Sequence, residues 1–279
     1  MNEPKAVAAE AVVPEAVASP PVVAPPAPRL LPARTLWAMF GRLMLLQAVW
    51  NYERMQGIGF AHALSPAVRK LAKDDAEAAR SLVPQAGYFN THPVMAAVAV
   101  GVVADQLERR ARGETALDDA GILRVKQALG SSLAAIGDPL FWNAVRPLLA
   151  LTAVYGWRDD RSWLGALTIV AGYNAFALGY RLRGLFQGYA RGLSYVAQLA
   201  RRLGPMTSGL RTIAGVIAAL VVSTVLLPTG GGTATQAILG VAGVALGLMF
   251  FGAARLGPGE WGLGIVLIVL AWATLAPGF

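Results

Sequence analysis

Residues 212–254 read TIAGVIAALVVSTVLLPTGGGTATQAILGVAGVALGLMFFGAA, a stretch of 43 residues without a charge. A membrane-spanning helix needs about 20 residues, so the stretch accommodates two, 212–228 and 234–254, with a Gly-rich turn between them. Two further candidates, 261–276 and 162–180, are flanked by Trp or Tyr, which anchor helices at the membrane interface. The pattern predicts an all-α, polytopic integral membrane protein.

The composition of the whole chain supports this class. The 279 residues are 56% hydrophobic and only 14% charged, whereas soluble domains carry about 25% charged residues. The absence of cysteine excludes disulfides, thiolate nucleophiles and Cys-type zinc sites. The net charge of +8 is explained better by basic residues on one side of a bilayer than by nucleic-acid binding.

The connection 181–211 is basic and amphipathic. It contains six arginines and no acid, so the positive-inside rule places it in the cytoplasm. Apolar residues recur at spacings of three and four, opposite a polar face, which predicts a helix lying in the membrane interface. Its basic face could contact anionic lipid or an acidic cytoplasmic partner.

The chain divides into a tail and a membrane domain. Residues 1–33 contain eight of the 17 prolines, and we expect them to form a disordered Ala/Pro-rich tail. Residues 34–279 form the membrane domain, in which 158–279 supplies the spanning helices and the connector.

Residues 34–157 have a less regular pattern. Their apolar runs are short or interrupted by arginine; the run 94–104, at 1.5 Å per residue, covers about half a bilayer. We therefore expect broken or re-entrant helices here, with solvated helices over the charged stretches 69–80 and 105–126.

A first polar cluster, QAVWNYERMQ, occupies residues 47–56 directly after an apolar run. On a helix, Gln47, Asn51 and Arg54 would share one face, and Glu53 would lie on a neighbouring face. Polar residues in an apolar helix are costly, so they normally face protein or a water-filled cavity.

Two more clusters are YFNTHP at 88–93 and AIGDPLFWN at 135–143. In each, a proline follows a polar residue, and an apolar run begins. This predicts a chain break at which a new helix starts, with Asp138 as an N-cap. The residues that we expect to line a substrate path or to shape these breaks are Gln47, Asn51, Glu53, Arg54, Asn90, Thr91, His92, Asp138, Trp142 and Asn143.

The three clusters together resemble a known family. QAVWNYERMQ (47–56), FNTHP (89–93) and IGDPLFW (136–142) are similar, in the same order, to motifs of the IID membrane component of mannose-family sugar phosphotransferase systems. The similarity extends from about Thr35 to the C-terminus.

The resemblance implies a multi-pass permease subunit of the bacterial inner membrane. Such a subunit pairs with a IIC membrane subunit, as a trimer of heterodimers, to translocate a hexose that cytoplasmic IIA and IIB phosphocarriers phosphorylate. It implies no cofactor, metal or catalytic residue in this chain, which would not be catalytic alone. Which hexose is carried stays open.

Two alternatives belong to other classes. One is a repurposed scaffold or regulatory membrane protein of the same family. The other is a membrane-embedded acid–base enzyme using His92, Asp138 and Glu53, which requires these groups to converge within about 3 Å of one substrate position.

Overall fold

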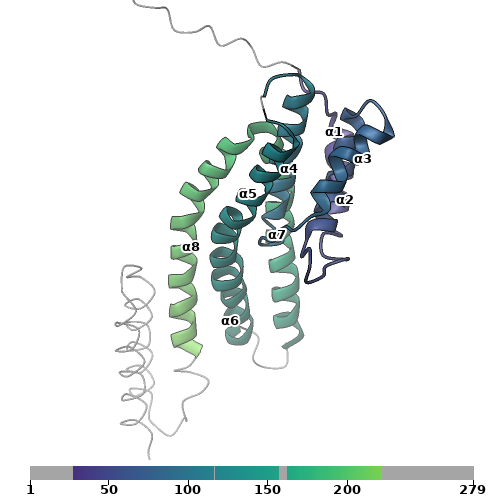
Figure 1. Cartoon of the computed structure of the whole chain (residues 1–279). Helices are drawn as coiled ribbons and strands as arrows, with labels where there is room; N and C mark the ends of the chain where they lie inside the picture. The colour runs from purple at the N-terminus through teal and green to yellow at the C-terminus, as the bar shows by residue number, and fades with distance from the viewer. Residues whose placement is uncertain (1–27, 116, 157–161, 222–279) are drawn as a thin grey trace, which may run out of the picture.

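The computed structural model describes residues 28–115, 117–156 and 162–221. These residues form helices, with two isolated bridges that involve Asn51, Met55 and Phe89. The all-α prediction is confirmed. Figure 1 shows their arrangement. The elements are α1 (Ala33–Leu43), α2 (Gly57–Leu71), α3 (Asp75–Leu82), the 3₁₀ turn η1 (Val83–Ala86), α4 (Ala96–Ala111), α5 (Asp119–Leu140), the π-helical turn η2 (Phe141–Val145), α6 (Arg146–Gly156), α7 (Ser162–Arg191) and α8 (Leu193–Val221).

Helix α4 is the centre of the packing. Every residue from Ala96 to Glu108 is buried, because other helices cover it on all sides. Helix α7 lies closely along it: a Cβ built on Gly101 of α4 would lie 2.3 Å from the carbonyl oxygen of Leu185. This contact is possible only because the residue has no side chain.

The chain break at His92-Pro93 is confirmed. Residues 90–92 are not helical, a turn covers 93–95, and α4 begins at Ala96. Proline disfavours helix in the residue before it, which keeps His92 extended and lets the chain turn into α4.

The break predicted at Asp138-Pro139 is wrong. Helix α5 runs through both residues to Leu140 and continues as η2 and α6, so Asp138 is not an N-cap. Pro139 cannot donate the backbone hydrogen bond that a helix requires at its position. The helix continues through this position, and the turn that follows, Phe141–Val145, is π-helical.

The helix predicted over residues 47–56 is also wrong, because the segment after α1 consists of turns. The side chain of Asn51 caps one turn: its Oδ1 accepts hydrogen bonds from the backbone N–H groups of Glu53 (3.1 Å) and Arg54 (2.9 Å). Met55 has a left-handed φ of 51°. Asn51 and Arg54 therefore do not share a helix face with Gln47.

The predicted separate helix over 181–211 is replaced by the ends of two long helices. Helix α7 continues to Arg191, and α8 starts at Leu193. Gly192 joins them with a left-handed φ of 58°, a conformation that glycine adopts readily. Tyr189 and Leu199 are buried as the spacing predicts, but by packing within the protein.

Within the described residues, no helix combines the length and the apolar character needed to cross a bilayer. The predicted span 162–180 forms the first part of α7, and 212–221 forms the end of α8. The rest of the span 212–228 and the spans 234–254 and 261–276 lie outside the described residues.

The prediction that 105–126 is solvated is wrong for three charged residues. Asp105, Glu108 and Lys126 are at most 2% exposed. Tyr189 donates a hydrogen bond to Glu108. The short-range pattern of charges could not reveal these distant contacts.

The predicted tail ends earlier than residue 33. Arg29 pairs with Asp105 (Nη1–Oδ1, 2.5 Å), and its Nη2 donates to the carbonyl oxygen of Ala190 (2.9 Å). Leu31 is buried, and its N–H donates to Glu108. Residues 28–33 thus belong to the packed domain, while 1–27 lie outside the described residues.

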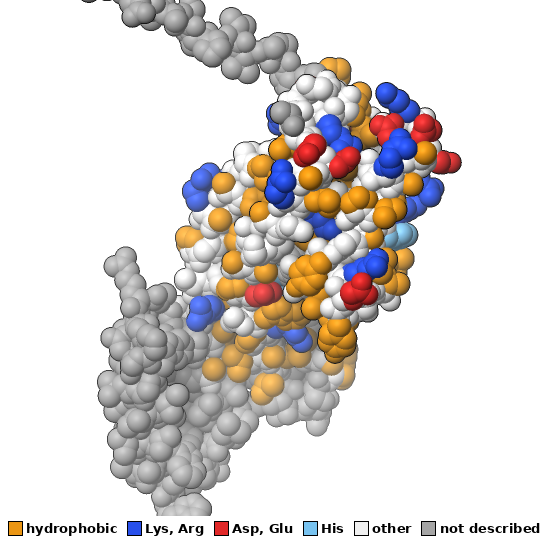
Figure 2. Space-filling model, in the orientation of Figure 1, with side chains coloured by type: hydrophobic (Ala, Val, Ile, Leu, Met, Phe, Trp, Pro, Cys, Tyr) orange, Lys and Arg blue, Asp and Glu red, His pale blue; other side chains and the backbone are white. Residues whose placement is uncertain are grey.

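The surface carries charge and apolar groups in different places. On the face in Figure 2, acidic and basic side chains gather around the end that carries α3, while hydrophobic side chains cover much of the middle. Large apolar side chains are also exposed on α7, including Trp163 (64%), Leu167 (51%) and Val170 (59%).

Candidate functional site

The first two polar clusters are joined by hydrogen bonds. Gln56 is 2% exposed, and its side-chain amide donates to the carbonyl oxygen of Thr91 (2.8 Å) and accepts from the N–H of Thr91 (3.3 Å). The backbones add bonds between Gln56 N and Phe89 O (2.9 Å) and between Phe89 N and Arg54 O (3.3 Å). The turn 51–56 therefore holds the extended segment 88–92 in place.

His92 connects the second cluster to the third. Its imidazole, 2% exposed, stacks on Phe141 with ring centroids 4.5 Å apart and an angle of 15°, and meets Trp142 edge-on at 5.0 Å. Its Nδ1 accepts from the N–H of Val94 (3.3 Å). Gly137 lies against it, since a Cβ there would be 2.5 Å from the Cβ of His92.

The third cluster presents polar and aromatic groups next to His92. Asp138 and Trp142 are four residues apart on the continuous helix, so their side chains lie on the same face. The guanidinium of Arg146 lies over the Trp142 ring, 4.5 Å from its centroid. Trp142 is 39% exposed, so one part of its ring packs in the protein and another part is accessible.

Helix α7 also packs against Phe141. Phe141 contacts the rings of Tyr173, Phe176 and Tyr180, with centroids 6.4, 5.5 and 5.8 Å away. The resulting aromatic layer fixes the π-helical turn against α7. We call the assembly of segment 88–92, the turn η2 with Asp138, and this layer the motif junction.

The remaining predicted residues lie at the surface around this region. Gln47, Glu53, Arg54, Asn90 and Asn143 are exposed, and Asn51 and Asp138 are half-buried. The side chain of Glu53 is 80% exposed and pairs with Arg54 (3.4 Å). Among the described residues, Glu53 forms no hydrogen bond or ion pair with the segments that carry His92 and Asp138, which meet each other. The acid–base alternative required all three to converge.

Two residues of the junction have buried side-chain atoms that lack a hydrogen-bond partner among the described residues: Thr91 Oγ1 and His92 Nε2. An unsatisfied buried polar atom costs about 1–3 kcal/mol. These two atoms therefore keep unused hydrogen-bonding capacity inside the junction.

Sequence reasoning missed Lys126, which supports the junction from α5. Its Nζ donates to the carbonyl oxygens of Gln85 (2.7 Å) and Gly87 (3.3 Å), just before the FNTHP segment, and lies over the ring of Phe60 (4.9 Å). Burial lowers the pKa of Lys126 to about 8. The partners of Lys126 are backbone carbonyls, which every residue has, so no residue type in the sequence marks them. The only sign in the sequence is that this lysine lies on an apolar helix face.

In the part of the chain that the structure describes, no three His, Cys, Asp or Glu side chains lie together as a candidate metal site. The junction instead offers hydrogen-bonding groups beside aromatic rings, which suits an uncharged polar ligand.

Sequence comparisons point to the same family. The family model of the PTS system mannose/fructose/sorbose family IID component matches residues 31–249. The mannose-specific EIID component of Escherichia coli (strain K12) is 36% identical over 162 residues, which are 58% of this chain and 56% of that protein. The fructose permease IID component of Bacillus subtilis (strain 168) is 31% identical over 180 residues, or 64% of this chain and 65% of that protein. The chain thus matches a little over half the length of the Escherichia coli relative.

Solved structures agree with the sequence comparisons. A membrane protein of known structure superposes with a TM-score of 0.64 at 28% identity, covering 89% of this chain and 99% of that one. A chain of the cryo-EM complex of the mannose transporter ManYZ with microcin E492 gives a TM-score of 0.55 at 26% identity, covering 90% and 100%. The chain belongs to the IID components of the mannose/fructose/sorbose family of sugar phosphotransferase systems, which are membrane proteins.

Proposed function

We propose that the chain is the IID half of a sugar permease that pairs with a IIC subunit in the bacterial inner membrane. The pair, as a trimer of heterodimers with multi-pass subunits, would move a hexose that IIA and IIB phosphorylate in the cytoplasm. In this role the chain contributes binding surface and helix geometry, and its partners contribute the phosphate chemistry.

The observation that carries the proposal is the convergence of the family motifs at the motif junction. Trp142 offers an accessible ring, and Asn90, Asp138 and Asn143 offer hydrogen-bonding groups at or near the surface. Sugars are held by such combinations, because hydroxyls take hydrogen bonds while the C–H faces of the ring pack on aromatics. Thr91 and His92 lie behind these groups and keep unsatisfied polar atoms.

The predicted site residues divide into two roles under this proposal. Asn90, Asp138, Trp142 and Asn143 would line the hexose path. The other six position the segment that carries them, either inside the junction or in the turns beside it: Gln47, Asn51, Glu53, Arg54, Thr91 and His92.

The exposed apolar surface supports a membrane environment and a membrane partner. In the turns after α1, Leu45, Val49 and Tyr52 are 56%, 51% and 84% exposed, next to the turn that holds the junction. Exposed apolar patches of this kind mark lipid or protein contacts. A IIC subunit seated there would lie beside the proposed sugar groups.

The test is uptake with the complete system. The chain would be expressed with IIC, IIA and IIB partners in cells that lack mannose-family transport, and phosphoenolpyruvate-dependent uptake of labelled hexoses would be measured. We expect Asp138→Ala and Trp142→Ala to reduce uptake at least tenfold while IIC still co-purifies.

The matched control is Trp163→Ala, which removes an exposed tryptophan at the start of α7 that lies outside all three motif sequences. It should leave uptake near the wild-type value. Co-purification of IIC without uptake of any hexose would overturn transport in favour of the scaffold or regulatory alternative. Recovery of the wild-type chain without IIC would overturn the pairing.

A further inference from the structure

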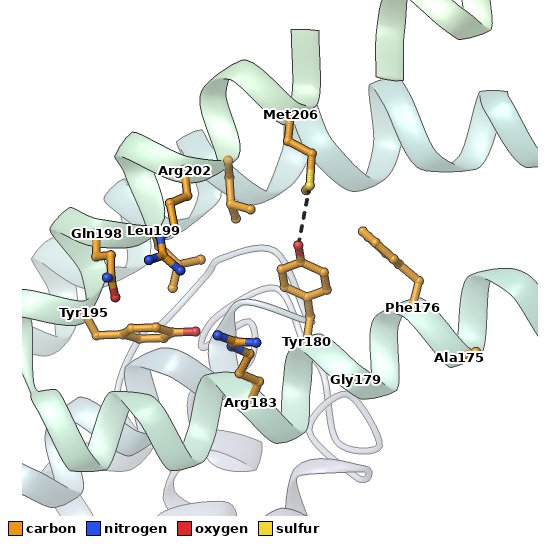
Figure 3. Close-up of a pocket in the computed structure, with 11 residues that line it drawn as sticks. Ala175, Phe176, Gly179, Tyr180, Arg183, Tyr195, Gln198, Leu199, Arg202 and Met206 are labelled. Carbon is orange, nitrogen blue, oxygen red and sulfur yellow. Dashed lines mark hydrogen bonds between the residues drawn. The ribbon is translucent and has the colours of Figure 1, made fainter. Parts of the chain in front are cut away.

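A groove lies between α7 and α8, with a volume of about 560 Å³, a size typical of small-ligand sites. Figure 3 shows that it has two unlike ends. Tyr195, Gln198, Arg183 and Arg202 surround one end. Phe176 lies toward the other, and the lining also includes Leu199, Leu203 and Met206.

The polar end carries uncompensated positive charge. Arg183 and Arg202 are exposed at the groove, and the Tyr195 hydroxyl points toward the Arg183 guanidinium (Figure 3). Helices α7 and α8 contain six arginines and no Asp or Glu. Among the described residues, none of these six forms an ion pair. Two guanidinium groups on one mouth are suited to bind a phosphate.

The apolar end determines what kind of anion fits. Phe176 lies toward this end, and the Tyr180 hydroxyl donates to Met206 (Oη–Sδ, 3.7 Å) across the groove, whereas Leu199 lies beside Gln198 and Arg202 (Figure 3). A free anion would gain nothing from this lining, whereas an acyl chain would bury apolar surface against it.

We propose that the groove binds an anionic phospholipid, with the headgroup phosphate between Arg183 and Arg202 and an acyl chain along the apolar lining. Phe176 and Tyr180 form the wall between the groove and Phe141, on which His92 stacks. The lipid would therefore brace α7 behind the motif junction. This inference does not depend on the sugar or on the IIC partner.

The test compares lipids that differ only in headgroup. The full chain, purified from membranes in mild detergent, would be mixed with phosphatidylglycerol or phosphatidylcholine of identical acyl chains, and bound lipid would be counted by native mass spectrometry. We expect preferential retention of phosphatidylglycerol, reduced about fivefold by each lost guanidinium, and hence by more than tenfold in R183Q/R202Q.

Two matched controls separate a site from general attraction. R201Q/R211Q removes the same charge from α8 outside the groove. Gly179→Phe fills the groove at constant charge, whereas Gly204→Phe adds the same ring to α8 outside the groove lining; a Cβ meets nothing within 4 Å at either glycine. We expect R183Q/R202Q and Gly179→Phe to lose the lipid, and both controls to keep it.

Equal loss in R201Q/R211Q, or equal retention of phosphatidylcholine, would overturn the proposal. Displacement by millimolar inorganic phosphate would also overturn it, in favour of a soluble-anion site. Unchanged lipid in R183Q/R202Q with loss of an acidic protein partner would assign the arginines to that partner. If a variant does not fold, a photoreactive phosphatidylglycerol on the wild-type chain must cross-link within 175–206, and cross-linking elsewhere would contradict the site.

Discussion

Gly137 lies directly against His92, so close that a Cβ on Gly137 would stand 2.5 Å from the His92 Cβ and 2.8 Å from Met95 Cγ. This contact joins two of the family motifs, IGDPLFW and FNTHP, across the start of α4. It explains why a residue without a side chain stands one position before Asp138, in the interior of a helix where glycine is otherwise unfavourable.

Gly137→Ala should therefore destabilise the protein. Neither His92, held by Phe141, nor the backbone of α5 can move away easily, and overpacking of this kind costs about 1–3 kcal/mol. Thermal unfolding of the purified protein in detergent would measure it. Gly41→Ala in α1 is the control: its Cβ meets nothing within 4 Å, so it should stabilise by up to about 1 kcal/mol. Equal stabilities of the two variants would contradict the contact.

Gln56→Leu should release segment 88–92 from the turn. The substitution keeps the apolar bulk but leaves the buried N–H and C=O of Thr91 without their partner. Each unsatisfied group costs about 1–3 kcal/mol, so we expect a loss of about 2 kcal/mol or more in the free energy of unfolding. The exposed Gln47→Leu in the same stretch should change stability by no more than about 0.5 kcal/mol. If Gln56→Leu is as stable as Gln47→Leu, then the bonds from Gln56 to Thr91 do not hold segment 88–92 in place.

Part of this arrangement could be predicted from the sequence because it rests on local chemistry. The break at His92-Pro93 follows from the restriction that proline imposes on its neighbour. The same rule failed at Asp138-Pro139, because packing of Phe141 against His92 and α7 keeps the helix continuous. There tertiary contacts override the local preference.

The turns at 47–56 show a different limit. Gln47, Asn51 and Arg54 have helical spacing, yet Asn51 caps a turn and Gly57 begins the next helix. Asn and Gly are residues that favour turns, so Asn51 and Gly57 in the sequence indicate a turn before the next helix. By contrast, Arg29 and Asp105 are 76 residues apart in the chain, and no local pattern predicts such a pairing.

Lys126 should give the protein a distinct pH dependence. Burial lowers its folded-state pKa from 10.5 to about 8. Between these values the unfolded chain binds the proton and the folded chain does not, so stability rises with pH through this window. Below pH 8 both states are protonated and the buried charge costs on the order of 3 kcal/mol.

Unfolding free energies of wild type and Lys126→Met, measured from pH 7 to 10.5, would isolate this contribution. As the pH rises above 8, the wild type should become more stable relative to Lys126→Met. The loss of the bonds to Gln85 and Gly87 sets the difference in unfolding free energy at low pH, but it does not change how that difference varies with pH. The exposed Lys70→Met serves as the reference and should retain the wild-type slope. A Lys126→Met curve parallel to wild type would show that the ammonium is solvated.

Truncation at the N-terminus should have an effect that depends sharply on its end point. Deleting 1–27 should leave stability unchanged, whereas deleting 1–32 also removes Arg29 and Leu31. The second deletion leaves Asp105, a buried carboxylate, without its cation. Because the side chain of Arg29 itself is 36% exposed, the loss should be smaller than the cost of about 3–5 kcal/mol for a fully buried pair. Arg29→Met in the full chain should reproduce most of this loss. Arg29→Lys should recover only part, since the guanidinium bonds Asp105 and the carbonyl of Ala190 through two separate nitrogens of a rigid fork, which a single ammonium nitrogen does not reproduce. The exposed Arg34→Met is the charge-matched control. If deletion of 1–32 is as silent as deletion of 1–27, residues 28–32 belong to the tail after all.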